Sequence, residues 1–285
     1  MPDHVLTEEP LQFGEGGRLF GILSLPGVPH RDARELPVFV FLNAGLLHRV
    51  GPYRLYVRLV RKLADMGFNS LRVDLAGRGD SPARSGLTNE QSVAADYEEI
   101  VGVLESRLGR LRLVLGGLCA GADNAIRLAP ADPRVIGMLL LDPVCSLDDG
   151  FRARAVVMKY TNPARYLVWL KRRLNLLPTL QGESEKDSEM LDPLTLRDQP
   201  TGEQLRAAFE AICERRGRVL SVFTRYATRY YNQLGQFGRT LDVAGYQRFC
   251  TELFWPQAAH TYTLELHRRR LIEEIKNWAG GYIRP

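Results

Sequence analysis

Cysteine is scarce in this sequence, and the cysteines form no pattern. The 285 residues include four of them, far apart along the chain, with no Cys-x-x-Cys pair and no cysteine–histidine cluster. Disulfide-rich secreted domains and zinc-binding modules require such patterns, so the sequence argues against both classes. We expect free thiols in a reducing, cytoplasmic environment, and we expect the chain to bind neither a metal nor a cofactor.

Long hydrophobic runs are also missing. No stretch approaches the roughly 20 apolar residues of a membrane-spanning helix, so a membrane partner is not expected. The N-terminus, Met1-Pro2-Asp3-His4, lacks the charged and then apolar segments of a signal peptide. With hydrophobic residues at 45% and charged residues at 25%, the composition instead predicts a packed globule.

The charge balance is mildly basic, with a formal net charge of +5. This excess is consistent either with ordinary surface charge or with a partner that has an acidic surface. The basic residues are not interleaved with a recognisable nucleic-acid-binding motif, so nucleic acid is not expected as a partner.

The first 145 residues alternate strand-like and helix-like segments. Residues 37–42 form a continuous apolar run, as expected for a strand buried on both faces. Such alternation predicts an α/β fold, with a mostly parallel sheet covered by helices. The expected strands are 18–25, 37–42, 69–74, 111–116, 135–141, 219–223 and, more weakly, 253–255, and the expected helices are 53–66, 89–108, 119–128 and 264–278.

Residues 146–216 interrupt this alternation. The segment has helical patterns, is rich in Arg and Lys, and contains no clear buried strand before strand-like runs resume at 219–223. We therefore expect one core made of residues 1–145 and 217–285, with residues 146–216 inserted as a helical lid or cap.

The strongest motif is Gly117-Leu118-Cys119-Ala120-Gly121, between an expected strand and an expected helix. A nucleophile at such a turn has a strained backbone, and small residues two before and two after it let the strand and the helix approach closely. The start of a helix also favours the negative thiolate form of a cysteine. The simpler alternative is a glycine-rich turn that carries a buried, inert cysteine.

A second motif, Asp74-Leu-Ala-Gly-Arg-Gly-Asp-Ser81, follows the expected strand at 69–74. Together the two motifs resemble those of the α/β-hydrolase superfamily, and the resemblance extends over residues 10–145 and 218–280. It implies an α/β-hydrolase fold, with a mostly parallel eight-stranded sheet flanked by helices and a helical lid insertion. It also places Cys119 at the position of the nucleophile.

The resemblance assigns further site residues. The backbone N–H groups of Leu46 and Ala120 would form the oxyanion hole, because the segment Ala44-Gly45 stands where the superfamily usually has His-Gly. Gly45 and His48 would contact the substrate, although His48 is alternatively a simple turn residue. His260, shortly before the last expected helix, stands where the superfamily has its histidine base.

A carboxylate is missing from the place where the superfamily usually has its third residue. The loop at 224–231 contains no Asp or Glu. Either Asp142, at the end of the expected strand 135–141, supplies the acid, or the site works as a Cys–His dyad, because a thiol loses its proton more easily than a hydroxyl. Asp142 is alternatively a residue that caps the following turn, and Asp148 and Asp149 are weaker candidates for the acid.

Residues 43–56, together with residues 117–124, resemble a bacterial subgroup of serine-aminopeptidase-like hydrolases that occur with the exosortase A system. This closer resemblance implies acyl transfer or hydrolysis and does not define a substrate.

A cysteine nucleophile would hold the acyl group as a thioester, and exchange between thioesters is nearly isoenergetic. We therefore predict an acyl-thioester hydrolase or acyltransferase of a biosynthetic pathway, with acyl-CoA or an acyl-carrier protein as the substrate. The basic helix expected at 165–177 could receive the carrier or the phosphates of CoA, or its apolar face could simply pack on the core. Two alternatives are a lyase or cyclase acting on a polyketide-like chain and a catalytically silent binding protein with the same fold.

Overall fold

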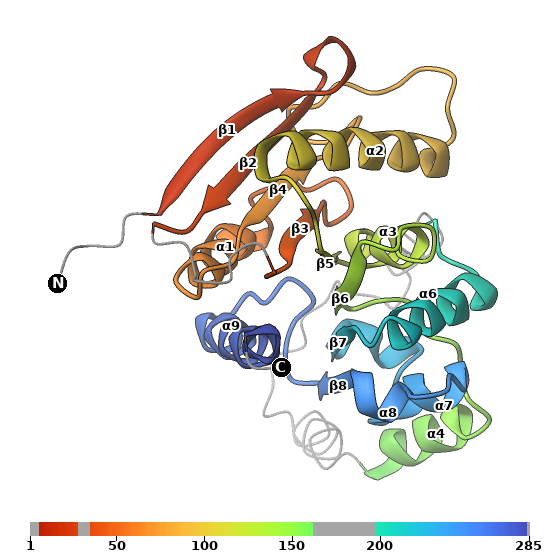
Figure 1. The fold of residues 1–285 in the computed structure, drawn as a ribbon. Coiled ribbons are helices and arrows are strands. Elements are labelled where there is room, and N and C mark those ends of the chain that lie inside the picture. The colour runs from red at the N-terminus through yellow and green to blue at the C-terminus, as the bar shows by residue number, and fades with distance from the viewer. Residues whose placement is uncertain (1–5, 28–34, 162–197, 284–285) are drawn as a thin grey trace, which may run out of the picture.

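The computed structural model describes residues 6–27, 35–161 and 198–283, and within these ranges eight strands form one sheet. The strand order is β1-β2-β4-β3-β5-β6-β7-β8, with β2 antiparallel to both of its neighbours and all other pairs parallel (Figure 1). The predicted mostly parallel eight-stranded sheet flanked by helices is thereby confirmed, whereas the predicted lid insertion stays a prediction. The strands are β1 (Thr7–Phe13), β2 (Leu19–Leu25), β3 (Val38–Leu42), β4 (Ser70–Asp74), β5 (Leu113–Leu118), β6 (Val135–Leu141), β7 (Arg218–Thr224) and β8 (Cys250–Trp255).

The sheet is buried on both faces, because helices cover both. Alternate residues of β3 show this directly: Val38, Val40 and Leu42 belong to one apolar cluster, and Phe39 and Phe41 belong to the other. One cluster includes α2 (Asn89–Leu108), α3 (Ala120–Leu128) and α6 (Gly202–Glu214), and the other includes α1 (Leu55–Ala64) and α9 (Glu265–Ala279), which lie together on the opposite side of the sheet (Figure 1).

Part of the segment predicted as a lid, residues 146–216, packs in the core. The segment begins with α4 (Phe151–Thr161) and ends with α6. Leu205, Phe209 and Ile212 of α6 are buried in the core cluster, so this helix is a layer of the core beside β7. The predicted basic helix at 165–177 lies outside the described residues.

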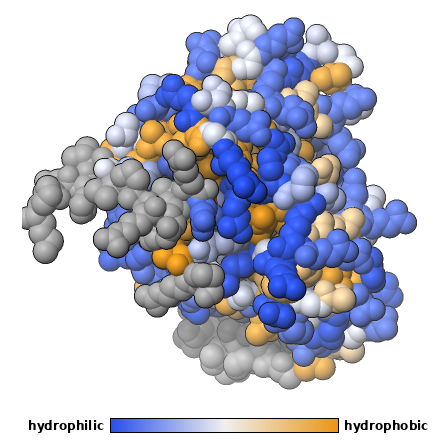
Figure 2. Space-filling view, in the orientation of Figure 1, coloured by the Kyte–Doolittle hydropathy of each residue, from blue (hydrophilic) through white to orange (hydrophobic). Residues whose placement is uncertain are grey.

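The surface is predominantly hydrophilic on the face seen in Figure 2, with smaller hydrophobic patches between the charged residues. Within the described ranges, no helix has the length and apolar character needed to cross a membrane.

The parallel strands place several segments at one edge of the sheet. Leu118 of β5 pairs with Leu141 of β6, and Leu141 pairs with Val222 of β7. Because parallel strands end on the same side, the residues that follow β5, β6, β7 and β8 meet at this edge. Three short helices flank the later strands: η4 (Arg225–Arg229), α7 (Gln236–Leu241) and α8 (Tyr246–Phe249).

The turn from β5 into α3 is packed without spare room. A Cβ atom on Gly121 would lie 2.6 Å from the carbonyl oxygen of Leu42 and 2.8 Å from that of Asn43. A Cβ atom on Gly117 would lie 2.8 Å from Gly121 Cα. The small residues at these two positions are therefore required because helix, strand and neighbouring loop touch through their backbones.

We predict that Gly121→Ala lowers the free energy of unfolding by about 1–3 kcal/mol or more, because the added methyl group meets backbone atoms that cannot rotate away. The matched control is Gly102→Ala in the exposed middle of α2, where nothing lies within 4 Å of the new atom. That change should raise the free energy of unfolding by up to about 1 kcal/mol. Urea unfolding measures both, and equal effects would contradict the close approach at Gly121.

Candidate active site

Cys119 lies at the sharp turn between β5 and α3. Its backbone has φ 58° and ψ −118°, a conformation that residues other than glycine rarely adopt. Its N–H donates to the carbonyl of Leu141 at 2.8 Å, and its own carbonyl accepts from Ala122 and Asp123 as the helix begins. The side chain is only partly buried, so the thiol is accessible at the edge of the sheet.

His260 lies in the loop between β8 and α9, and it contacts Asp142. Its Nδ1 is 2.6 Å from Oδ2 of Asp142, the residue that directly follows β6. The Asp142 carboxylate is fully buried, whereas the histidine side chain is 25% exposed. Cys119 is close enough to the imidazole to raise its pKa. The thiol and the buried carboxylate thus lie on either side of the His260 ring, and since Nδ1 is bound to Asp142, Nε2 is the ring nitrogen left free of that contact.

Thr224 is the second partner of the buried carboxylate. Its backbone N–H donates to Oδ1 of Asp142 at 2.6 Å, and its hydroxyl donates to Oδ2 at 2.6 Å. Thr224 ends β7, beside the loop in which the sequence offers no acid. The sequence pattern gave no reason to assign Thr224 a role, because a threonine at a strand end is common and its partner lies 82 positions away.

The electrostatic environment favours the protonated form of His260. Burial lowers its pKa, but the hydrogen bonds to Asp142 and to Cys119, together with the charges of these two groups, raise it more strongly. The net result is a pKa of about 9 against an ordinary value of 6.5. At neutral pH an imidazole with this pKa is mostly protonated.

Tyr56 contacts the strand that leads into the turn at Cys119, and sequence reasoning missed it. Its hydroxyl accepts a hydrogen bond from the N–H of Leu118 at 2.7 Å and donates to the carbonyl of Leu42 at 3.3 Å. The side chain is completely buried, and burial raises the pKa of its phenol. Tyr56 therefore ties the end of β5 to the end of β3.

The loop after β3 contains the residues predicted for the oxyanion hole and the substrate. Asn43, which is buried, donates to the carbonyl of Leu47 and to Asp74, and accepts from the N–H of Leu75 at 2.8 Å. These bonds hold the loop against the end of β4. Gly45 has φ 60°, a conformation that favours glycine, and the Leu46 side chain is 85% exposed. The roles predicted for Leu46, Gly45 and Ala120 stay predictions.

His48 belongs to an ionic cluster in the same loop. Its Nε2 lies 3.2 Å from Asp80, and its Nδ1 accepts from the N–H of Val50 at 3.3 Å. His48, Asp74 and Asp80 are of types that ligate metals and lie close together. The guanidinium of Arg49, however, contacts both carboxylates, so a cation of the protein itself already offsets part of their charge. The predicted contact of His48 with the substrate stays a prediction.

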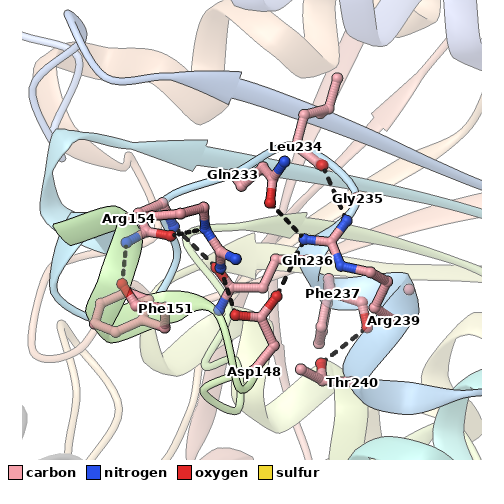
Figure 3. A network of polar contacts seen from close by, with 12 residues as sticks. Asp148, Phe151, Arg154, Gln233, Leu234, Gly235, Gln236, Phe237, Arg239 and Thr240 are labelled. Carbon is pink, nitrogen blue, oxygen red and sulfur yellow. Dashed lines mark hydrogen bonds and ion pairs between the residues drawn. The ribbon is translucent and has the colours of Figure 1, made fainter. Parts of the chain in front are cut away.

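Asp148 is bound elsewhere and does not contact His260 among the described residues. Figure 3 shows its carboxylate between the guanidinium groups of Arg154 and Arg239, which come from α4 and α7. Gln236 extends this network, because its side chain accepts from the N–H of Asn232 and donates to the carbonyl of Tyr230. Asp148 thus joins α4 to α7 through its two arginine partners.

The fold and the arrangement at the edge of the sheet define an α/β hydrolase. The family model described as "Serine aminopeptidase, S33" matches residues 43–212, which is more than half of the chain. The chain therefore belongs to this family. A search of curated protein sequences found no match.

Solved structures of low sequence identity share the fold. An esterase from Pyrococcus furiosus has 12% identity and a TM-score of 0.57, with 99% of this chain and 92% of that chain covered. A proline iminopeptidase from Mycobacterium smegmatis has 14% identity and a TM-score of 0.54, covering 97% of this chain and 98% of that one. An α/β serine hydrolase homologue from Coxiella burnetii has 12% identity and a TM-score of 0.52, covering 95% and 96%.

We predict that Asp142→Asn lowers the pKa of His260 from about 9 toward 6.5, because the strongest partners of the imidazolium include this carboxylate. NMR titration of the imidazole ring measures the change. Asp148→Asn is the matched control: it removes a carboxylate of the same connecting segment that contacts arginines instead, and it should leave the His260 titration unchanged.

The raised pKa also predicts a pH dependence of stability. A group with a higher pKa in the folded state stabilises that state fully below its unfolded value, here 6.5, and the contribution is lost as the pH rises through about 9. Between these limits, the free energy of unfolding of the wild type should therefore decline more steeply than that of Asp142→Asn. Parallel slopes in urea unfolding from pH 6 to pH 10 would contradict the assignment.

Proposed function

We propose that this α/β hydrolase transfers acyl groups from thioesters through an acyl-enzyme intermediate on Cys119, with His260 as the base and Asp142 as the triad acid. The observation that carries the proposal is the hydrogen bond from the imidazole to a buried carboxylate, with a partly buried thiol near the same imidazole. This is the constellation of nucleophile, base and orienting acid that acyl transfer requires.

The first half of the reaction forms the acyl-enzyme. The sulfur of Cys119 attacks the carbonyl carbon of the substrate while Nε2 of His260 takes the thiol proton. The tetrahedral intermediate expels the carrier thiol, which receives the proton from His260. The pKa of about 9 suits this step, since the imidazole holds the proton at neutral pH until the leaving sulfur accepts it.

The second half releases the acyl group. Water, or an alcohol or amine acceptor, loses a proton to Nε2 and attacks the Cys119 thioester; the sulfur leaves and takes the proton back. Asp142 keeps one tautomer of His260 by binding Nδ1, so that Nε2 serves both steps. The predicted donors for the developing oxyanion are the N–H groups of Leu46, in the loop after β3, and of Ala120, the residue after Cys119.

The preference for thioesters follows from the sulfur. An acyl group that moves from one thiol to another changes little in free energy, whereas the acyl thioester formed from an oxygen ester lies uphill. Acyl-CoA and acyl-carrier protein are therefore the substrates that we propose. The net charge of +5 is compatible with the phosphates that both of these carriers contain.

The proposal predicts an acyl adduct on Cys119. Incubation of the protein with a hexanoyl-CoA probe, followed by intact mass spectrometry, should show one added hexanoyl group. Cys119→Ala should abolish the adduct and lower thioester turnover by about 10³-fold or more. An adduct that persists in Cys119→Ala would contradict the proposal, and turnover that persists without an adduct would favour acid–base lyase chemistry.

Cys145→Ala is the matched control for this experiment. Cys145 is buried, and burial raises the pKa of its thiol, so it is a poor nucleophile. Removing it should leave the adduct and the turnover as they are in the wild type. Cys119→Ser keeps the shape of the turn and should favour oxygen esters over thioesters more strongly than the wild type does.

A further inference from the structure

Tyr226 stacks on His260. The centres of the two rings are 4.1 Å apart, and their planes differ by 29°. Tyr226 is the second residue of η4, which directly follows β7, and both rings are half-buried. The contact joins two segments that lie more than thirty positions apart in the sequence, and none of the roles assigned above uses it.

The position of the Tyr226 ring is itself fixed. The N–H of Tyr226 donates to the hydroxyl of Thr224 at 3.3 Å. The guanidinium carbon of Arg229 lies 5.1 Å from the centre of the tyrosine ring, within the range of a cation–π interaction. The N–H of Arg225 donates to the carbonyl of Ala258 at 3.0 Å, which joins η4 to the loop that carries His260.

Thr224 closes a ring of contacts. Its hydroxyl donates to Oδ2 of Asp142 and accepts from the N–H of Tyr226. The same Oδ2 binds Nδ1 of His260, and His260 stacks on Tyr226. The carboxylate, the hydroxyl, the tyrosine and the imidazole therefore form a closed loop in which each member restrains the next.

A hydrogen bond at Nδ1 alone does not orient an imidazole. It sets the position of one ring atom, but the ring can still turn about the line from Nδ1 to the carboxylate oxygen. Such a turn would move Nε2 away from Cys119. A flat ring at stacking distance removes this freedom, because any tilt of the imidazole then meets the face of the tyrosine.

We propose that Tyr226 is a positioning residue for His260, whose ring sets the plane of the imidazole so that Nε2 stays directed at Cys119 while Nδ1 remains on Asp142. The proposal rests on the function proposed above for this site. The electron-rich face of the tyrosine also favours the cationic imidazolium that forms during acyl transfer.

The test compares Tyr226→Leu with Tyr226→Phe in the full chain. Leucine fills much of the space without offering a flat face, so kcat for a hexanoyl-CoA probe should fall by about 10–100-fold while KM changes by less than about threefold. Phenylalanine keeps the face, and its kcat should stay within about threefold of the wild type. This separation of kcat from KM is expected because the ring orients the base and does not bind the substrate.

NMR titration of His260 gives a second measurement that does not depend on turnover. In Tyr226→Leu the imidazole keeps Nδ1 on Asp142 but turns Nε2 away from Cys119, so the part of the raised pKa that comes from Cys119 should be lost and the pKa should fall below about 9, whereas Tyr226→Phe should retain the high value. A tyrosine that only stabilises the fold would leave this titration unchanged.

Circular dichroism and thermal melting establish that each variant is folded. If Tyr226→Leu does not fold, Tyr226→Met replaces it as the variant without a flat ring. Equal losses of kcat in the phenylalanine and leucine variants would overturn the proposal, as would an unchanged kcat and titration in the leucine variant. If the wild type failed to hydrolyse thioesters, the proposed function would fall, while the effect of Tyr226 on the His260 titration would still decide its positioning role.

Discussion

The structure at the carboxyl edge of the sheet depends on one buried carboxylate. Asp142 has no exposed surface, and a charge in that position is tolerated only where donors surround it. Thr224 provides two of these donors and His260 a third. Because Asp142 follows β6, Thr224 ends β7 and His260 lies in the loop after β8, the hydrogen bonds to a single carboxylate join these three segments.

The same carboxylate also sets the electrostatics of the base. An isolated, partly buried imidazole would prefer to be neutral, because burial lowers its pKa. The contacts with Asp142 and Cys119 reverse this preference. The site therefore favours the protonated imidazole beside Cys119.

Much of the fold was predictable because its signals are local. The bounds expected from the sequence for α2 and β6 agree with the structure, since a capping box at Thr88 begins the helix and a continuous apolar run defines the strand. The nucleophile turn was predictable for a similar reason: Gly117 and Gly121 are required by backbone contacts that a motif records directly. The expected strand at 253–255 was too short, because the actual strand begins at Cys250, where the pattern is mostly polar and partly exposed.

The rest could not be predicted because it depends on pairs distant in sequence. Asp142 was expected as the partner of His260 only as one of two alternatives, because the two residues are separated by 118 positions and no local pattern joins them. Tyr56, Thr224 and Tyr226 carry no motif, and their contacts arise only when the strand ends are brought together. The packing of α6 into the core was missed for the same reason, since its helical pattern does not reveal which surface its apolar face covers.

The presence of a carboxylate beside His260 changes the explanation for the cysteine. The loop at 224–231 contains no acid, and on that basis alone a cysteine would compensate for an incomplete triad. A thiol ionises more readily than a hydroxyl and so depends less on an acid. The distance of 2.6 Å between Asp142 and His260 removes that argument: the histidine has an acid, supplied from β6 and held there by Thr224. A serine could have been activated in this geometry as well. Under the function proposed above, sulfur has another explanation: when the acyl donor is also a thiol, a thiol nucleophile makes both the forward and the reverse transfer accessible.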